Sequence, residues 1–346
     1  MIEIDGSTHS GSGTLLRYSV ALATITGEPL HMVRIRARRD KLGLRPQHLE
    51  AVRACASLCS GTLEGGEVGS REIRYYPGKH LRGGSYEWDI GTAGSTTMLA
   101  FAAIPVALFA DAPCRFTITG GVFQDFAPSG FHLQHVLFPL LRRMGADVRM
   151  EIVRPGYVPQ GQGRLRVEVS PMGKPLSPLR MLDQGKITSI RGISLASHLT
   201  EGKVAERMAE QCRKRLSNFE PVIDVVDDAS ATQPGAALLL WAETTTGCLV
   251  GSDQAGKRGR RSESIADFVT RTLIEDIESG ATTDRHLADQ LILFAALAKG
   301  ATEYRIPRLT DHVESNLWLV ERILGAHAEV KDNLLRVEGV GRRAHD

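Results

Sequence analysis

His312 is the residue of this sequence best suited to nucleophilic chemistry. It lies in LTDHVESNLWLVERIL, where Asp311 and, three residues later, Glu314 form a capping-box-like helix start. A side chain in the first turn lies at the positive end of the helix dipole, which disfavours imidazolium and attracts phosphate. A neutral imidazole beside a nucleotide is therefore a reasonable nucleophile. Taken alone, the position fits a surface or capping role better, so other residues must decide.

Asp289 and Gln290 interrupt the otherwise apolar segment LADQLILFAALA. A carboxylate inside a buried helix is costly unless a partner holds it, and such residues are often functional. The alternative is a structural Asp in a first helical turn, where the helix dipole favours it.

Basic residues are concentrated in RIRARRDKLGLRPQHL, which contains Arg34, Arg36, Arg38, Arg39, Lys41 and Arg45. If this segment is a strand end, Arg34, Arg36 and Arg38 share one face, and their guanidinium groups suit the phosphate groups of a nucleic acid. A solvated strand edge is the alternative. A second basic cluster, GKRGRR at residues 256–261, is predicted to be a mobile loop.

Two glycine-rich segments, GSTHSGSG (residues 6–13) and GTAGSTT (residues 91–97), each precede an apolar helix, as anion-binding loops do. Neither matches the P-loop motif GxxxxGK[ST], or the dinucleotide-binding motif GxGxxG with an acidic residue downstream of it. Each is a weak signal by itself.

The elements that must position these residues follow one pattern three times, starting near Ile4, Asp89 and Thr282. Each copy has an almost wholly apolar helix, a strand, and a more amphipathic helix that ends near Gly61, Gly145 or Gly325, where glycine supplies a left-handed cap. Strand pairs, such as those containing Leu165–Val169 and Leu334–Val337, follow. The sequence predicts an α/β (α+β) fold with three β-α-β-α-β-β repeats, forming three sheets with their helices packed inward.

The third copy starts roughly 110 residues later than the spacing of the first two predicts, so an insertion must precede it. The predicted strands of the insertion are Lys186–Leu195, Val222–Val226, Ala236–Ala242 and Cys248–Gly251, and its predicted helices are Lys203–Leu216 and Ser264–Ile277. We expect a catalytic three-repeat domain over residues 1–181 and 280–346, and a smaller α/β domain over residues 182–279.

Composition places few limits on the partners of the chain. Its 346 residues, of which 42% are hydrophobic, can bury more than one core, and a net charge of +2 neither requires nor excludes a nucleic acid. Five cysteines without a CxxC pair favour a reduced cytoplasm and buried thiols over a zinc site. The N-terminus does not resemble a signal peptide, and the longest apolar run, Met98 to Ala110, is too short to cross a bilayer. We expect a cytoplasmic protein without a membrane partner.

The combination of motifs resembles the RNA 3′-terminal phosphate cyclase family. The resemblance covers nearly the whole chain in order: IDGSTHSGSGTLLR, IRARRDKLGLRPQHL, IGTAGSTT, the stretch at residues 120–128, GYVPQGQG, IRG at residues 190–192, KVAER, LADQL and the helix that starts at His312. The family's fold, three repeats with one insert before the last, agrees with the organisation above.

The resemblance implies ATP-dependent conversion of an RNA 3′-phosphate to a 2′,3′-cyclic phosphate, through enzyme-histidine-AMP and RNA-adenylate intermediates. ATP and a divalent metal, Mg²⁺ or Mn²⁺, are the implied cofactors, and RNA with a 3′-phosphate end is the implied partner. The metal ligands are not identified, and association into a homodimer is left open.

The resemblance also assigns residues to roles. His312 is the implied catalytic nucleophile. Arg17, Arg36, Arg39 and Gln47 match RNA-phosphate-binding or activity-critical positions, while Asp289 and Gln290 match the nucleotide-contacting pair. His286 replaces an aromatic residue that stacks on adenine, with Pro128 and Phe131 near the other side of that slot.

The chain departs from the family pattern around the expected ATP phosphates and metal. Ser10 replaces a Glu, Thr14 a Gln, Leu42 a Pro, Phe101 a Gln associated with metal and phosphate, the segment 122–125 a TDNP-like segment, and Gln162 a Gly. The nucleophile is not among these changes.

Two other classes remain as alternatives. A diverged, non-catalytic relative would be an RNA-binding or assembly factor, but such relatives lose the nucleophilic histidine, whereas His312 is present. An enolpyruvyl transferase has a similar repeating unit but a longer chain with more copies, so the length argues against it.

Overall fold

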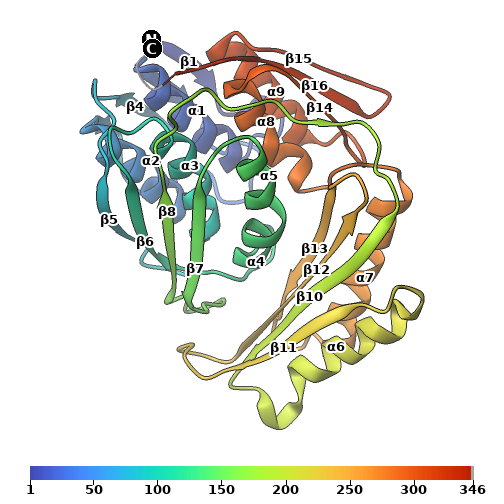
Figure 1. Ribbon diagram of the computed structural model, residues 1–346. Helices are drawn as coiled ribbons and strands as arrows, with labels where there is room; N and C mark the ends of the chain where they lie inside the picture. Colours follow the sequence, from blue (N-terminus) through green and yellow to red (C-terminus); the bar gives the residue numbers. More distant parts are fainter. Residues whose placement is uncertain (344–346) are drawn as a thin grey trace.

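The structure, a computed structural model, describes residues 1–343 and has a mixed α/β fold, which confirms the predicted fold class (Figure 1). Its described strands form four sheets of four strands each. Among the described residues, no helix has the length and apolar character needed to cross a membrane.

Three of these sheets share one strand order and one pairing pattern. In each, the first two strands are parallel and the other neighbours are antiparallel. The first sheet has the order β1 (Ile2–Asp5), β2 (Leu30–Val33), β4 (Ile73–Tyr76), β3 (Thr62–Glu64). The second has the order β5 (Gly84–Asp89), β6 (Cys114–Gly120), β8 (Gly163–Val169), β7 (Val148–Arg154). The third has the order β9 (Arg180–Met181), β14 (Lys299–Arg305), β16 (Leu334–Val340), β15 (His327–Lys331).

Two helical segments accompany each of these sheets. They are α1 (Gly13–Thr26) and α2 (Pro46–Cys59), then α3 (Thr96–Ala107) and the continuous run α4 (Gly130–His132), η1 (Leu133–Leu137) and α5 (Phe138–Arg143), then α8 (Leu287–Leu297) and α9 (Asp311–Leu324). Almost every residue of α1, α3 and α8 is buried, as helices that are apolar on all sides must be. These helices fill the interior of the body, with the sheets around them (Figure 1).

Residues 182–279 form the fourth sheet, which extends away from the helical body in Figure 1. Its strand order is β11 (Val222–Asp228), β10 (Ile187–Ser197), β12 (Gly235–Thr244), β13 (Leu249–Ala255), and it is covered by α6 (Val204–Arg215) and α7 (Ser262–Glu278), with short 3₁₀ turns at Thr200–Gly202 and Ser217–Phe219. We call this segment the insert. It has its own apolar core, which includes Met208, Leu240 and Val269.

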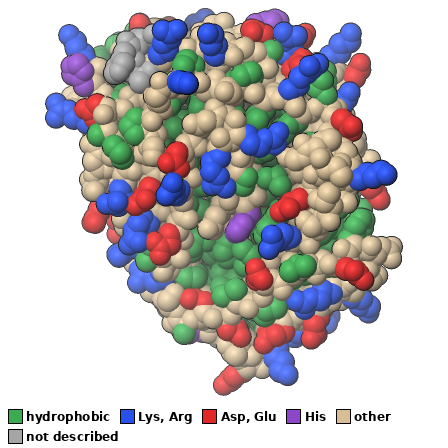
Figure 2. Space-filling model, viewed as in Figure 1, with side chains coloured by type: hydrophobic (Ala, Val, Ile, Leu, Met, Phe, Trp, Pro, Cys, Tyr) green, Lys and Arg blue, Asp and Glu red, His purple; other side chains and the backbone are tan. Residues whose placement is uncertain are grey.

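The insert also packs against the rest of the chain. The His135 ring in η1 stacks on the Trp241 ring in β12 with 4.7 Å between ring centres, and Cys248 belongs to the main core. On the face shown in Figure 2, Lys and Arg side chains are interspersed with Asp and Glu, in keeping with the small net charge. The predicted domain boundaries at 181/182 and 279/280 stay a prediction.

The helix caps differ in detail from the sequence expectation. Ser60, not Gly61, takes the left-handed conformation that ends α2, with φ of 54°, whereas Gly325 caps α9 as expected with φ of 70°. Gly61 has another reason to be glycine, because a Cβ atom there would lie 2.8 Å from the Tyr76 carbonyl oxygen. At the start of α9 the capping residue is Thr310, whose hydroxyl accepts a hydrogen bond from the Val313 backbone N–H.

The predicted strand geometry of the arginine segment is wrong. β2 ends at Val33, and the residues after it form turns in which Arg34 and Arg36 have φ of 51° and 56°. Side-chain alternation therefore does not apply. Arg34 pairs with Asp5, Arg38 donates to the His9 carbonyl oxygen, and Arg36 reaches the cleft described below.

Candidate active site

A cleft of about 450 Å³ lies where the N-terminal turns of α1, α2, α8 and α9 meet. It brings together residues from the two ends of the chain, such as Arg17 and His312. Helix N-termini present unpaired backbone N–H groups and a positive dipole end, so their convergence favours a phosphate-bearing ligand. Its lining consists of Ser12, Gly13, Thr14, Arg17, Tyr18, Arg36, Arg39, Gln47, His48, Met98, Phe101, Phe126, Pro128, His286, Asp289, Gln290 and His312.

His312 is half-buried in the first turn of α9. Burial, followed by the nearby charges of Arg17 and Arg39, lowers the pKa of its imidazole to about 4. Because a base with a lowered pKa loses its proton earlier as the pH rises, the ring is neutral at pH 7 and has a lone pair available for attack.

Hydrogen bonds around Thr14 are compatible with the tautomer of that neutral ring that attack through Nε2 requires. Arg17 Nη2 donates to Thr14 Oγ1 over 3.2 Å, and the same oxygen lies 3.2 Å from His312 Nδ1. A hydroxyl oxygen can accept two hydrogen bonds, so it can take the Nδ1–H of His312 as well as the Arg17 proton. In the tautomer with the proton on Nδ1, the lone pair lies on Nε2.

Three arginines give the cleft its charge. Arg17 is 7% exposed, and burial lowers its pKa to about 10, which leaves it protonated at neutral pH. Arg36 is half-buried and donates to the carbonyl oxygens of Lys41 and Gly43, while Arg39 is exposed. Since Asp289 is the single carboxylate in the lining, this cluster favours an anion.

Asp289 and Gln290 lie in the first turn of α8, on the wall of the cleft. Asn316 Nδ2 in α9 donates to the backbone oxygen of Asp289 over 3.0 Å and to its Oδ2 over 3.3 Å. Burial raises the pKa of the Asp289 carboxyl to about 7. Gln290 Oε1 is buried and has no hydrogen-bond partner among the described residues, so it can accept a hydrogen bond from a ligand.

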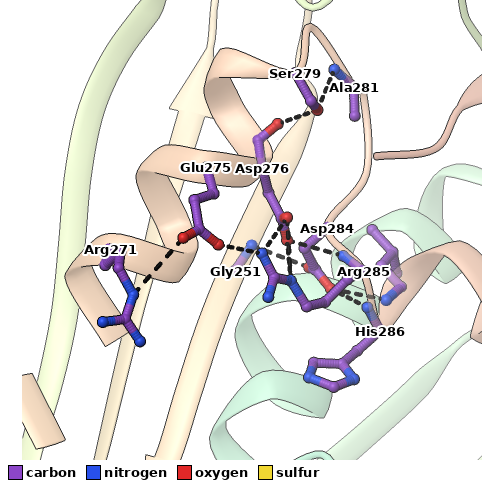
Figure 3. Close-up of polar contacts among 10 residues, drawn as sticks. Gly251, Arg271, Glu275, Asp276, Ser279, Ala281, Asp284, Arg285 and His286 are labelled. Carbon is purple, nitrogen blue, oxygen red and sulfur yellow. Dashed lines mark hydrogen bonds and ion pairs between the residues drawn. The ribbon is translucent and has the colours of Figure 1, made fainter. Parts of the chain in front are cut away.

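His286 begins α8 and is held by the preceding Asp284. Asp284 Oδ1 accepts the backbone N–H groups of His286 and Leu287, each over 2.8 Å, and Oδ2 accepts from the Gly251 N–H in the insert over 3.0 Å. Figure 3 shows this junction, with Arg285 turned toward α7. His132 in α4 completes it, because its Nε2 lies 3.1 Å from Asp284 Oδ2 in a pair with no exposed surface.

The structure thus places every proposed site residue except Phe131 in one cleft. The Phe131 ring packs instead on Phe123, with 4.9 Å between ring centres, and Phe126 lines the cleft in its stead. His48, which no sequence motif singled out, also lines the cleft. Its side chain lies so close to Gly13 that a Cβ atom there would come within 2.1 Å of His48 Nε2. The only signal was its place at the start of the predicted second helix.

Three of the family departures, at Ser10, Thr14 and Phe101, fall at or beside this cleft. Thr14 contacts His312, and Phe101 is an apolar, 3% exposed part of the lining. Ser10 lies behind the lining, where its hydroxyl is 3.0 Å from that of Ser12 and accepts from Ser315 over 2.8 Å.

Comparison with known proteins gives a consistent match. Residues 8–330 match the family model described as RNA 3′-terminal phosphate cyclase. The chain is 40% identical over 342 residues to the RNA 3′-terminal phosphate cyclase of Nitrosospira multiformis, covering 97% of this chain and 96% of that protein. It is 39% identical over 333 residues to that of Methanothermobacter thermautotrophicus, with 96% of each covered. The crystal structure of the enolpyruvyl transferase NikO from Streptomyces tendae aligns with a TM-score of 0.40 and 11% identity, over 98% of this chain and 48% of that one, a likeness too weak to indicate a shared activity.

Proposed function

Because the chain belongs to the RNA 3′-terminal phosphate cyclase family, we propose that it uses ATP to convert an RNA 3′-phosphate into a 2′,3′-cyclic phosphate. The observation that supports this proposal most directly is the cleft, in which a neutral His312 lies beside three arginines and the N-termini of four helices. The proposed nucleophile and the arginines proposed to bind phosphate thus line the same cleft.

In the first step, the lone pair of His312 Nε2 attacks the α-phosphorus of ATP. A P–N bond forms, the bond to the β-phosphate oxygen breaks, and its electron pair leaves with pyrophosphate. Thr14 Oγ1 can accept the Nδ1–H of the attacking ring, and Arg17 offsets the negative charge that develops on the phosphoryl oxygens.

In the second step, an oxygen of the RNA 3′-phosphate attacks the phosphorus of the bound AMP and releases His312. The vicinal 2′-hydroxyl then attacks the 3′-phosphorus, loses its proton, and expels AMP. Adenylation makes this possible because AMP is a far better leaving group than the hydroxide or oxide ion that an unactivated phosphate would have to expel. The exposed Arg39 and half-buried Arg36 are suited to hold the RNA phosphates during both transfers.

A divalent metal, Mg²⁺ or Mn²⁺, remains part of the proposal. Mg²⁺ is usually held by one or two carboxylates together with substrate phosphates. Among the described residues no group of three or more His, Cys, Asp or Glu side chains is placed to hold a metal ion, and Asp289 is the carboxylate of the cleft lining. The residues therefore fit a metal carried mainly by the phosphates of ATP, which would add positive charge there.

The charge state of His312 can be tested without turnover. We expect an NMR titration of the free protein, with the ring signal assigned through its loss in His312→Asn, to give a midpoint near pH 4. The ring should be neutral across pH 6–8, because burial and the neighbouring arginines lower its pKa. A midpoint near the ordinary value of about 6.5 would mean that His312 is not held in this environment.

Arg39→Ala should weaken binding of a 3′-phosphorylated oligoribonucleotide, because Arg39 is an exposed cation at the cleft. We expect about a tenfold rise in Kd at low salt and a salt dependence reduced by about one counterion, as for loss of one phosphate contact. Fluorescence anisotropy over a series of salt concentrations measures both.

Arg38→Ala is the matched control for this experiment. Arg38 is also exposed and belongs to the same turn, but it donates to the His9 carbonyl oxygen and is outside the cleft lining. Equal losses in the two variants, or none in Arg39→Ala, would assign Arg39 to the solvated surface.

A further inference from the structure

Phe126 is the most exposed of the large hydrophobic side chains in the described residues, at 104% of the reference value for its type. A single exposed hydrophobic residue is ordinary by itself. Phe126 differs from the others because it also lines the cleft that contains His312 and the three arginines. Its aromatic face is thus open to solvent at a site suited to phosphate.

The backbone around Phe126 is held firmly on the N-terminal side. Phe123 is buried and packs on Tyr157, with 5.7 Å between ring centres. Asp125 accepts two hydrogen bonds from Arg260 of the insert, over 2.8 and 2.9 Å, and Arg260 also donates to the Ala255 carbonyl oxygen over 2.6 Å. The basic segment 256–261, expected to be a mobile loop, therefore contains an anchor for the cleft wall.

The C-terminal side is held by the insert as well. Ser129 N–H donates to Asp253 Oδ2 of β13 over 2.7 Å, and the Ser129 hydroxyl caps α4 by accepting from the His132 N–H. Between these anchors Phe126 has φ of 65°, a conformation that bulky residues seldom adopt. The loop that presents this side chain to solvent is thus anchored on both sides.

Such a side chain suits a nucleobase. A 3′-phosphate bound at the arginines belongs to a strand that must continue out of a cleft of about 450 Å³, which is the size of a small-molecule site. Single-stranded RNA is commonly bound by stacking its unpaired bases on aromatic side chains beside a positively charged groove.

We propose that Phe126 is a stacking platform for a base at the 3′ end of the RNA, and that the insert holds it in place through Arg260 and Asp253. This proposal rests on the proposed function for the identity of the ligand. It adds a residue that binds the RNA strand outside the phosphate-binding arginines. Stacking does not depend on which base contacts the ring. We therefore expect RNA affinity to change little when the stacked base is replaced by another base, and to fall when that base is missing.

The test uses the full chain and a fluorescent 3′-phosphorylated oligoribonucleotide in anisotropy titrations, which need no turnover. Phe126→Ala should raise Kd by about 5- to 100-fold, the loss expected for one base–aromatic stack, and Phe126→Tyr should stay within about threefold of wild type. Phe219→Ala is the matched control, because Phe219 is an exposed aromatic of the insert outside the cleft lining.

Oligonucleotides that lack the terminal or the penultimate base identify the stacked base. For one of these oligonucleotides, the Kd with wild type should equal the Kd of intact RNA with Phe126→Ala. The Kd of the same oligonucleotide should not rise further when Phe126 is replaced. Equal binding of intact RNA by wild type and Phe126→Ala would overturn the proposal. A rise in the KM for ATP in place of the Kd for RNA would also overturn it, since it would assign Phe126 to the adenine.

These outcomes are separate from those that test the reaction. RNA binding that depends on Phe126, in a protein that forms no cyclic end, would support the platform and contradict the proposed function. Normal cyclisation with RNA binding that does not depend on Phe126 would support the proposed function and contradict the stacking platform.

Discussion

His312→Ala is expected to remove all covalent AMP from the protein while leaving it folded. Wild type incubated with ATP should gain one AMP, because a neutral His312 lies in the phosphate-binding cleft. The variant has no nucleophile in its place, and the side chain it loses is only half-buried in a first helical turn. We expect at least a thousandfold lower adduct formation, as for loss of an enzyme's nucleophile. Intact-mass spectrometry measures the adduct directly.

His48→Ala is the useful comparison for this experiment. His48 lines the same cleft, but burial and nearby arginines lower its pKa to about 2, and a Cβ atom on Gly13 would collide with its ring. Adduct that survives in His48→Ala and disappears in His312→Ala identifies the nucleophile. An adduct that persists in His312→Ala would place the covalent chemistry on another residue.

Asp284→Ala is expected to lower the free energy of unfolding by about 3–5 kcal/mol, because it removes one partner of a fully buried charged pair. Burial opposes the charged form of both groups. Against it, the Asp284 carboxylate raises the pKa of His132, and His132, followed by the His286 side chain and the Leu287 N–H, lowers the pKa of Asp284 to about 2. The variant leaves the His132 ring and the Gly251 N–H without their acceptor. Urea unfolding monitored by circular dichroism gives the difference.

Glu151→Ala provides the matched control for that loss. Glu151 pairs with Arg166 over 2.6 Å, but both side chains are largely exposed, so its removal should cost less than about 1 kcal/mol. A similarly small loss in Asp284→Ala would show that the pair does not hold the start of α8.

The sequence predicted the fold class because periodicity and helix boundaries are local properties. The wholly apolar helices had to be buried, and α1, α3 and α8 are. His312 was placed correctly in a first turn even though the cap is Thr310, since a shift of one residue leaves it near the same helix end.

Features that depend on tertiary contacts or on unusual backbone angles were not predicted. Arg34 and Arg36 have left-handed φ values, so a rule based on strand alternation failed for them. His132 and Asp284 are 152 residues apart, and nothing local in either segment indicates the pair. Phe126 likewise depends on Arg260, 134 residues beyond it in the chain, for the position of its loop.

Cyclisation of an RNA 3′-phosphate protects that end from a phosphatase, which makes the proposed reaction measurable. A 3′-phosphorylated oligoribonucleotide is incubated with the protein, ATP and either Mg²⁺ or Mn²⁺, and then with a phosphatase. We predict that wild type makes the end resistant to phosphatase only when ATP is present, with His312→Ala giving no protection. An end that stays fully sensitive with both metals, in protein shown to be folded, would contradict the proposed cyclase activity.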